Sequence, residues 1–559
     1  MSGLSAGIYS CMSGYETVIY EKNAVAGGNC SGWKRGDYYI DNCLHWLTGS
    51  REGSGQNKIW REIGALDDNV ALIKRDMFYS TEKDGVTVTL WRDISRTQRE
   101  LISLSPEDEK EITHFLDAVR VGVSFTEPAS DAATFIKAIK AADITTPASD
   151  MMMAIIGYLG MSTSELAERF KHPAIKTLIL DFMAKEYEAY WLIMAYGFFV
   201  SENGDLPEGG SVGLVKRIQD KYLSLGGKLI LGTPVKNVSI VKTPKADLNE
   251  IRKEFIAEID NDLPANMSAA KYISGYLRLL RDTGSVVVKE TGKSIKHIYK
   301  RMTNGIYLEN GSFVPADYVI CACDMNYVFS DLVNNKYVPK PIKKELKGNS
   351  KNTIYSSFQV AFSVDGEMEE VPDTLGIDCE PFDVARHTFS RFNIKNYRLY
   401  GDYIAPKGST VIQVSITQYK DDFKFWKTIY KDKSRYRQVK INIAWAIMER
   451  IVARFPQYEG KIHILDTWTP ITYSRRNNCY YGAYMRFITT LTRSGAYISD
   501  SMFLVNNIYL AGQWLIYPGG LPMSAFTGKM AIKSINRREK NDALEPKQPD
   551  VELGTVSLK

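Results

Sequence analysis

Glycines and one acid near the start of the chain have the spacing of a nucleotide-binding turn. Gly3 opens a short segment of small residues that predicts a helix to about residue 12, and residues 17–20 predict a buried parallel strand that ends at Glu21. A glycine-led helix and a strand ending in an acid form the second half of a dinucleotide-binding βαβ unit, in which the acid accepts hydrogen bonds from a ribose diol. Alone, this half unit is a weak signal.

The first half of that unit does not occur in the sequence. The two earlier glycines of the motif, and the strand before them, would fall upstream of Met1. We therefore expect Met1 to be an internal methionine of a longer reading frame. The alternative is a short chain whose phosphate site is impaired.

A second glycine turn strengthens the interpretation. Gly27, Gly28 and Asn29 follow Glu21 closely. Paired glycines let the backbone approach a diphosphate and donate N–H groups to it. A plain Gly-Gly turn is the alternative.

A third turn lies near the other end of the chain. Residues 508–511 predict a short buried strand that ends at Gly512, and Gly519 and Gly520 lead into a helix opened by Leu521 and Pro522. A glycine loop at a helix N-terminus presents free N–H groups and the positive end of the helix dipole. This geometry suits the N1 and C2 carbonyl of a flavin, where negative charge develops on reduction.

Together these motifs resemble those of the FAD-dependent carotenoid desaturase, carotenoid isomerase and retinol saturase family, whose wider group includes amine oxidases. A glycine turn at residues 226–227 with a strand to Val235 also fits. The resemblance implies FAD as the cofactor. The residues it implies for FAD binding are Gly3, Glu21, Lys22, Gly27, Gly28, Asn29, Val235, Gly512, Gly519, Gly520, Leu521 and Pro522. The chain departs from the family in lacking the first strand and first two glycines, and in carrying Gln513 where many relatives have an acid.

The resemblance implies an α/β fold with two domains. A Rossmann-like FAD-binding domain of the amine oxidase and desaturase type is discontinuous, and a second, α+β domain of mixed sheet and helices binds the substrate. The expected FAD segments are 1–70, 207–345, with an insert at 245–300, and 495–537. The expected substrate segments are 71–206, mostly helical, and 346–494, with strands and a long helix near 421–455, and residues 538–559 are expected to be a disordered tail.

The function implied is hydride transfer between flavin N5 and a carbon of an apolar polyene or isoprenoid-like substrate, as desaturation, saturation or isomerisation. A flavin oxidase of C–N bonds and a non-catalytic flavoprotein remnant are the alternatives. Only one dinucleotide unit is detectable, which favours FAD with a separate electron acceptor or donor. His45 is a candidate to face the substrate or the flavin, with a satisfied structural histidine as the alternative. Tyr473 and Tyr484 are candidates near the reactive face of the flavin, and neither is expected to act as a base.

Composition excludes other classes. Lys and Arg total 70 and Asp and Glu total 65, a net charge of +5, which is too balanced for a nucleic-acid binder. Seven scattered cysteines predict reduced thiols, and no metal site is expected. Apolar runs at residues 151–156 and 190–194 are candidates for a lipid tunnel or its mouth, with ordinary helix core as the alternative. A cytoplasmic protein, with peripheral membrane contact as an option, is therefore expected.

Overall fold

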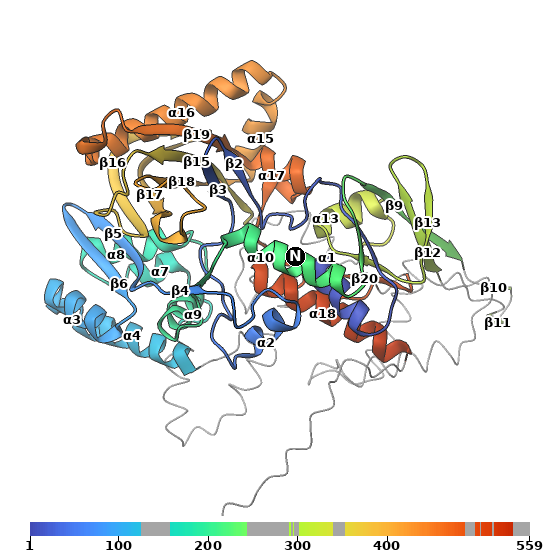
Figure 1. The fold of residues 1–559 in the computed structure, drawn as a ribbon. Coiled ribbons are helices and arrows are strands. Elements are labelled where there is room, and N and C mark those ends of the chain that lie inside the picture. The colour runs from blue at the N-terminus through green and yellow to red at the C-terminus, as the bar shows by residue number, and fades with distance from the viewer. Residues whose placement is uncertain are drawn as a thin grey trace, which may run out of the picture.

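The computed structural model describes residues 1–124, 157–242, 290–291, 294–295, 301–338, 353–486, 498–502, 505–516 and 519–539. Within these residues the fold is α/β, as predicted (Figure 1). Most of the predicted insert at 245–300, the apolar run at 151–156 and residues 540–559 lie outside the described residues.

Helix α1 (Ser2–Met12) lies beside two separate pairs of parallel strands. One pair joins β1 (Val18–Tyr20) to β8 (Lys228–Ile230), and the other joins β14 (Val319–Cys321) to β20 (Ile508–Leu510). A Cβ atom on Gly7 would come within 2.9 Å of Ile19, and one on Gly3 within 3.4 Å of Ala322, so α1 packs closely on both pairs. The prediction that residues 17–20 form a buried strand is wrong about burial, because β1 pairs only with β8 and Val18 is 39% exposed.

Two further helices pack against α1 at glycines. Tyr222 of α10 (Gly210–Ser224) occupies the space over Gly7, and Gly528 of α18 (Gly520–Glu539) faces the start of α1. A Cβ atom on Gly528 would lie 2.8 Å from both the Ser2 carbonyl oxygen and the Ala6 nitrogen. The predicted start of the disordered tail, residue 538, is too early, because α18 continues to Glu539.

A three-stranded antiparallel sheet lies beyond these helices (Figure 1). Its order is β13 (Phe313–Pro315), β12 (Arg301–Leu308) and β9 (Val235–Lys242). The strand predicted to continue to Val235 is in fact two strands. Gly232, whose φ of +65° favours glycine, separates β8 from β9, and the two strands pair with different partners.

A seven-stranded mixed sheet dominates the other half of the molecule. In spatial order it contains β19 (Ile462–Trp468), β15 (Tyr355–Val364), β18 (Thr410–Tyr419), β17 (His387–Asn396), β16 (Thr374–Val384), β5 (Met77–Lys83) and β6 (Val86–Trp91). The prediction that residues 71–206 are mostly helical is therefore incomplete. The hairpin of β5 and β6 extends this sheet because β5 pairs in parallel with β16.

Helices cover this sheet on both sides (Figure 1). The long helix predicted near 421–455 is two helices, α15 (Lys420–Ile429) and α16 (Lys433–Arg454), because Asp432 accepts hydrogen bonds from the main chain of Ser434 and Arg435 and starts a new helix. Buried apolar residues of β5 and β6 share a hydrophobic core with five further helices: α3 (Ile94–Leu104), α4 (Glu109–Ser124), α7 (Thr163–Ala167), α8 (Pro173–Phe182) and α9 (Ala189–Val200).

Shorter elements complete the described chain. They are β2 (Gly32–Arg35), β3 (Tyr38–Asp41), α2 (Gly55–Glu62), β4 (Leu72–Ile73), β7 (Leu206–Pro207), β10 (Glu290–Thr291), β11 (Ser294–Ile295), α13 (Met325–Tyr327), α17 (Pro470–Asn477), the 3-10 turns η1 (Pro106–Asp108), η3 (Arg398–Tyr400), η4 (Pro456–Tyr458) and η5 (Tyr480–Gly482), and the π turn η2 (Val328–Leu332). Within the described residues, no helix combines the length and the apolar character needed to cross a bilayer.

The contact of α1 with α18 can be tested with Gly528→Val. The side chain would overlap the main chain of Ser2 and Ala6, so we expect the free energy of unfolding to fall by about 1–3 kcal/mol. Lys533→Val, at an exposed position of the same helix, is the control, because valine there costs only helix propensity, at most about 0.7 kcal/mol. Urea unfolding followed by circular dichroism measures both, and equal losses would contradict the close packing.

Candidate functional site

A cavity of about 840 Å³ lies at the meeting point of the two halves, within the size range of small-molecule sites. Segments distant in sequence line it. At one end are the start of α1, the loop at residues 27–30, the loop at residues 322–324 and the turns at residues 512–514 and 519–524. At the other end are residues 180–184, α9 and the strands β17 and β18. The first end is rich in glycine and backbone, and the second in large side chains.

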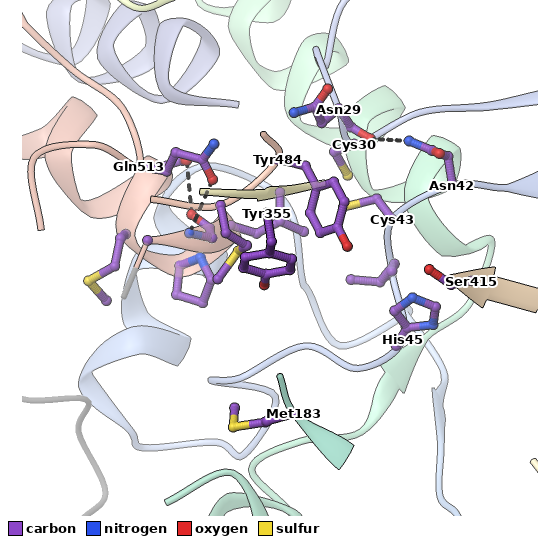
Figure 2. Close-up of a pocket in the computed structure, with 18 of the residues that line it drawn as sticks. Asn29, Cys30, Asn42, Cys43, His45, Met183, Tyr355, Ser415, Tyr484 and Gln513 are labelled. Carbon is purple, nitrogen blue, oxygen red and sulfur yellow. Dashed lines mark hydrogen bonds between the residues drawn. The ribbon is translucent and has the colours of Figure 1, made fainter. Parts of the chain in front are cut away.

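Two helix N-termini reach the cavity. Met1 and Ser2 line it at the start of α1, and Gly520 lines it at the start of α18. The first N–H groups of a helix have no acceptor within the helix, and the helix dipole places partial positive charge there. Gln513 orients the turn before α18, because its Oε1 accepts a hydrogen bond of 3.4 Å from the Gly520 N–H (Figure 2). Anionic or electron-rich groups are therefore favoured at this end.

The glycine loop after β1 is shaped for backbone access. Gly27 has a φ of +107°, and a Cβ atom there would lie 2.5 Å from the Cys30 carbonyl oxygen, so the turn requires glycine. Gly28 has a φ of +63°, and a Cβ atom there would meet no atom within 4 Å. Its main chain therefore faces the cavity directly. Asn29 is held beside it by Asn477, whose amide donates to Asn29 Oδ1 at 2.5 Å.

These features fit FAD. Backbone N–H groups at two helix starts and at a glycine loop suit a diphosphate and the pyrimidine edge of a flavin. Eight of the twelve residues predicted to bind FAD line the cavity: Gly27, Gly28, Asn29, Gly512, Gly519, Gly520, Leu521 and Pro522. When bound, FAD supplies a centre that accepts or donates a hydride.

The other four predicted residues lie outside the cavity lining. Gly3 faces Ala322 and lets α1 approach the loop after β14. Glu21 ends β1, and its Oε1 accepts two hydrogen bonds of 2.8 Å from Asn23, which orient the carboxylate at the strand end. Val235 begins β9 and pairs with Leu308.

Lys22 makes a structural link instead of facing the cavity. Its Nζ donates to Asn478 Oδ1 at 2.7 Å and to the Arg475 carbonyl oxygen at 3.1 Å. Burial lowers the pKa of this ammonium group. Lys22 thus ties the end of β1 to the end of α17.

His45, a candidate from the sequence, lines the cavity. Its ring points toward the cavity (Figure 2). Burial, with the positive charge of Lys395 next in importance, lowers the pKa of His45 to about 3. The imidazole is therefore neutral near pH 7 and supplies no positive charge to a substrate.

Tyr473 and Tyr484 also line the cavity, next to Tyr355. The ring of Tyr484 lies 5.4 Å from the ring of Tyr355 and 5.4 Å from that of Tyr473. Burial raises the pKa of Tyr484 to about 12 and raises the pKa of Tyr473 as well. Neither phenol ionises near neutral pH, which agrees with the expectation that neither acts as a base.

The hydroxyl of Tyr473 joins the two halves of the site. It accepts hydrogen bonds from Gln359 Nε2 at 2.8 Å and Trp468 Nε1 at 2.9 Å, and donates to Asn42 Oδ1 at 3.1 Å. Asn42 Nδ2 in turn donates to the Asn29 carbonyl oxygen at 3.1 Å (Figure 2). This chain of bonds connects the seven-stranded sheet to the glycine loop.

Sequence reasoning missed Asp324, a buried acid that lines the cavity just after β14. One carboxylate oxygen accepts from the main chain of Asn326 at 2.9 Å, and the other accepts from Tyr480 N at 3.2 Å and Trp514 Nε1 at 3.0 Å. Burial raises the pKa of Asp324 to about 6 although these bonds oppose the shift. No motif in the sequence marks this position.

Two cavity cysteines were also missed as a pair. Cys30 and Cys43 both line the cavity, as does Cys323, which is exposed. Each of the seven cysteines is free.

The opposite end of the cavity is lined mainly by large apolar side chains, with the ion pair of Asp181 and Arg391, joined at 2.6 Å, among them. Tyr190, Trp191, Met194, Ala195 and Phe198 line it from α9. Leu180, Phe182 and Met183 line it from the end of α8 and the loop that follows. The predicted apolar run at residues 190–194 is thus both helix core and cavity wall. Asn393, Ser415 and Thr417 add polar groups from β17 and β18.

This chain is similar to known proteins in sequence and in fold. The family model described as flavin containing amine oxidoreductase matches residues 1–250 and 278–534. The 4,4'-diaponeurosporene oxygenases of Staphylococcus aureus strains MW2 and MRSA252 are each 21% identical over 563 residues, which cover 96% of this chain and 97% of theirs. The crystal structure of an oxidoreductase from Methanosarcina mazei superposes with a TM-score of 0.51 at 12% identity, covering 96% of this chain and 98% of that one, and shows a common fold.

These matches confirm the resemblance to the carotenoid desaturase-type family and the prediction of FAD as the cofactor. The chain is a flavin-dependent oxidoreductase and belongs to the flavin-containing amine oxidoreductase family.

Proposed function

We propose that this enzyme transfers a hydride between N5 of FAD and a carbon of an apolar polyene or isoprenoid-like substrate, in a desaturation, a saturation or an isomerisation. The observation that carries the proposal is one cavity whose glycine-lined end continues into an end walled by large apolar side chains. Apolar walls stabilise a hydrocarbon chain by removing its surface from water. They also keep water from the reacting atoms.

The proposal assigns each end of the cavity a task. The start of α1 and the loop of Gly27 and Gly28 bind the diphosphate, and Gly512, Gly519 and Gly520 meet the flavin. Segments 1–70, 207–345 and 495–537 then form the FAD-binding domain, and segments 71–206 and 346–494 form the substrate domain. The protein's task in catalysis is to hold a substrate carbon about 3–3.5 Å from N5.

The ionisable groups support chemistry without a strong base. His45 is neutral, and Tyr473 and Tyr484 keep their protons near pH 7. An unactivated polyene carbon needs shape and orientation more than it needs proton transfer. The relative named 4,4'-diaponeurosporene oxygenase, whose name gives a carotenoid as substrate, supports the same substrate class. We also propose that a separate electron acceptor or donor serves the enzyme described here, and that this enzyme contacts a membrane peripherally.

A flavin oxidase of C–N bonds is the second candidate. It needs an aromatic pair facing the flavin and a lysine that holds a water near N5. Tyr355 and Tyr484 offer an aromatic pair, but none of the described residues lining the cavity is a lysine. The described residues of the cavity therefore supply the aromatic pair but not the lysine. The third candidate, a non-catalytic remnant, predicts a protein that binds its ligand without turnover.

FAD binding at the glycine loop can be tested with Gly28→Asn. Asparagine tolerates the left-handed backbone, so the fold is kept. Its side chain, however, projects into the space where the diphosphate of FAD is proposed to meet the main chain of Gly28. We expect the flavin retained on purification, measured by visible absorbance, to fall about tenfold, a loss of about 1.4 kcal/mol in binding.

Gly36→Asn is the matched control. Gly36 has a φ of +60° and no neighbour within 4 Å, but it lies at the tip of the β2–β3 hairpin and outside the cavity lining. It should keep its flavin. Equal flavin content in both variants would remove the assignment of the diphosphate to this loop.

The apolar end can be tested with Ala195→Trp. Ala195 lines the cavity from α9, and the larger ring would fill space that a long polyene needs. We expect KM for an acyclic isoprenoid polyene, supplied in detergent micelles, to rise about tenfold while the flavin spectrum stays unchanged. Ala195→Ser, which changes the size little, is the control. Turnover of benzylamine by the wild type, with none of the polyene, would favour the C–N oxidase instead.

A further inference from the structure

Cys30 and Cys43 are register partners in an antiparallel hairpin. Strands β2 and β3 pair Gly32 with Asp41 and Trp33 with Ile40. The hydrogen bond of 3.0 Å from Asn42 N to the Ser31 carbonyl oxygen continues the same register by one residue. The next pair outward is Cys30 opposite Cys43, with both side chains on one face of the hairpin.

This position has the geometry of a disulfide. In an antiparallel ladder the bonded and non-bonded pairs alternate, and since Ser31 and Asn42 are a bonded pair, Cys30 and Cys43 are a non-bonded one. The Cα atoms of such pairs lie about 4.5 Å apart, within the range of about 4.4–6.8 Å found in disulfides. The two sulfur atoms lie near each other at the cavity wall (Figure 2), and Cys30 Sγ also donates to the Ser211 carbonyl oxygen at 3.7 Å.

The hairpin that carries the pair is held firmly. Asp41, which is buried, accepts at Oδ1 from the main chain of Cys43 at 3.0 Å and of Leu44 at 3.1 Å. Trp33 Nε1 donates to Asp466 Oδ2 at 2.9 Å and anchors the other strand to β19. Cys30 is fixed by the turn at Gly27, whose carbonyl oxygen accepts from the Cys30 N–H at 3.2 Å. Both cysteines are thus presented to the cavity by rigid backbone.

We propose that Cys30 and Cys43 form a redox-active pair: the two thiols lose two electrons and two protons, an Sγ–Sγ bond forms, and the oxidised flavin of the same cavity takes up both electrons and becomes the reduced flavin. The reverse step returns the electrons to the disulfide. The inference rests on the proposed placement of FAD in this cavity, where both cysteines lie beside the glycine loop. Each protein chain then stores two electron pairs, one on the flavin and one on the thiols.

The protonation of Cys43 fits this balance. The neighbouring Cys30 thiol, followed by burial, raises the pKa of Cys43 well above its usual range. At neutral pH Cys43 therefore carries its proton, which oxidation releases together with the electrons.

The first test maps the bond on the full-length holoenzyme. The protein is equilibrated with oxidised and reduced glutathione at several ratios, alkylated, digested and analysed by mass spectrometry. We expect a peptide linked through Cys30 and Cys43 that disappears reversibly as reduced glutathione increases. Flavin absorbance is recorded on the same sample. Flavin-bound protein without the linked peptide would overturn the pair, whereas a protein without flavin would overturn the proposed function and the electron exchange with it.

The second test counts electrons. Pre-oxidised wild type is titrated anaerobically with dithionite, and the total uptake by flavin and disulfide, before free dithionite accumulates, should be two two-electron equivalents per FAD. Cys43→Ser should consume one. Cys479→Ser is the matched control, because Cys479 also lines the cavity but its thiol contacts Asn29 at 3.7 Å, and it should consume two. One equivalent for the wild type would overturn the exchange between the pair and the flavin, even if the linked peptide forms.

Discussion

The site depends on how closely α1 and α18 approach each other. Gly528 places the main chain of α18 against the first turn of α1, and Gly7 lets α10 and β1 pack on the same helix. Because of this packing, two helix N-termini from opposite ends of the chain reach one cavity. Partial positive charge concentrated in this way favours a diphosphate and a reduced flavin.

The cavity is also a junction between two kinds of structure. Loops and helix starts supply backbone at the cofactor end, and the seven-stranded sheet with α9 supplies side chains at the other. Tyr473 connects them through Asn42 and Gln359. Gln359 continues the connection into the sheet, since its Oε1 accepts from Gln413 Nε2 at 3.0 Å. Each of these buried polar groups is satisfied by the next, so the relative position of the two ends is fixed by hydrogen bonds rather than by packing alone.

Local signals in the sequence predicted much of the cofactor end. Gly27, Gly28, Gly519 and Gly520 were recognisable because a positive φ or close backbone approach restricts a position to glycine, and this restriction is visible in one sequence. Strands were expected within residues 346–494, and β15, β18 and β19 lie there. The prediction that β1 is buried was wrong because the sequence of a three-residue strand does not indicate which strands pair with it.

Other parts of the site depend on contacts between distant residues and were not predictable. Burial raises the pKa of Asp324 against the hydrogen bond from the Tyr480 main chain, and Tyr480 and Trp514, which hold its carboxylate, are far away in sequence. The pairing of Cys30 with Cys43 depends on the register of the β2–β3 hairpin, which the sequence analysis did not predict. The two ends of the cavity also differ in what holds them. The hydrogen-bonded link through Tyr473 belongs to loops and strands, while much of the apolar wall comes from α9, so a substitution on that helix can reshape the wall without breaking the link.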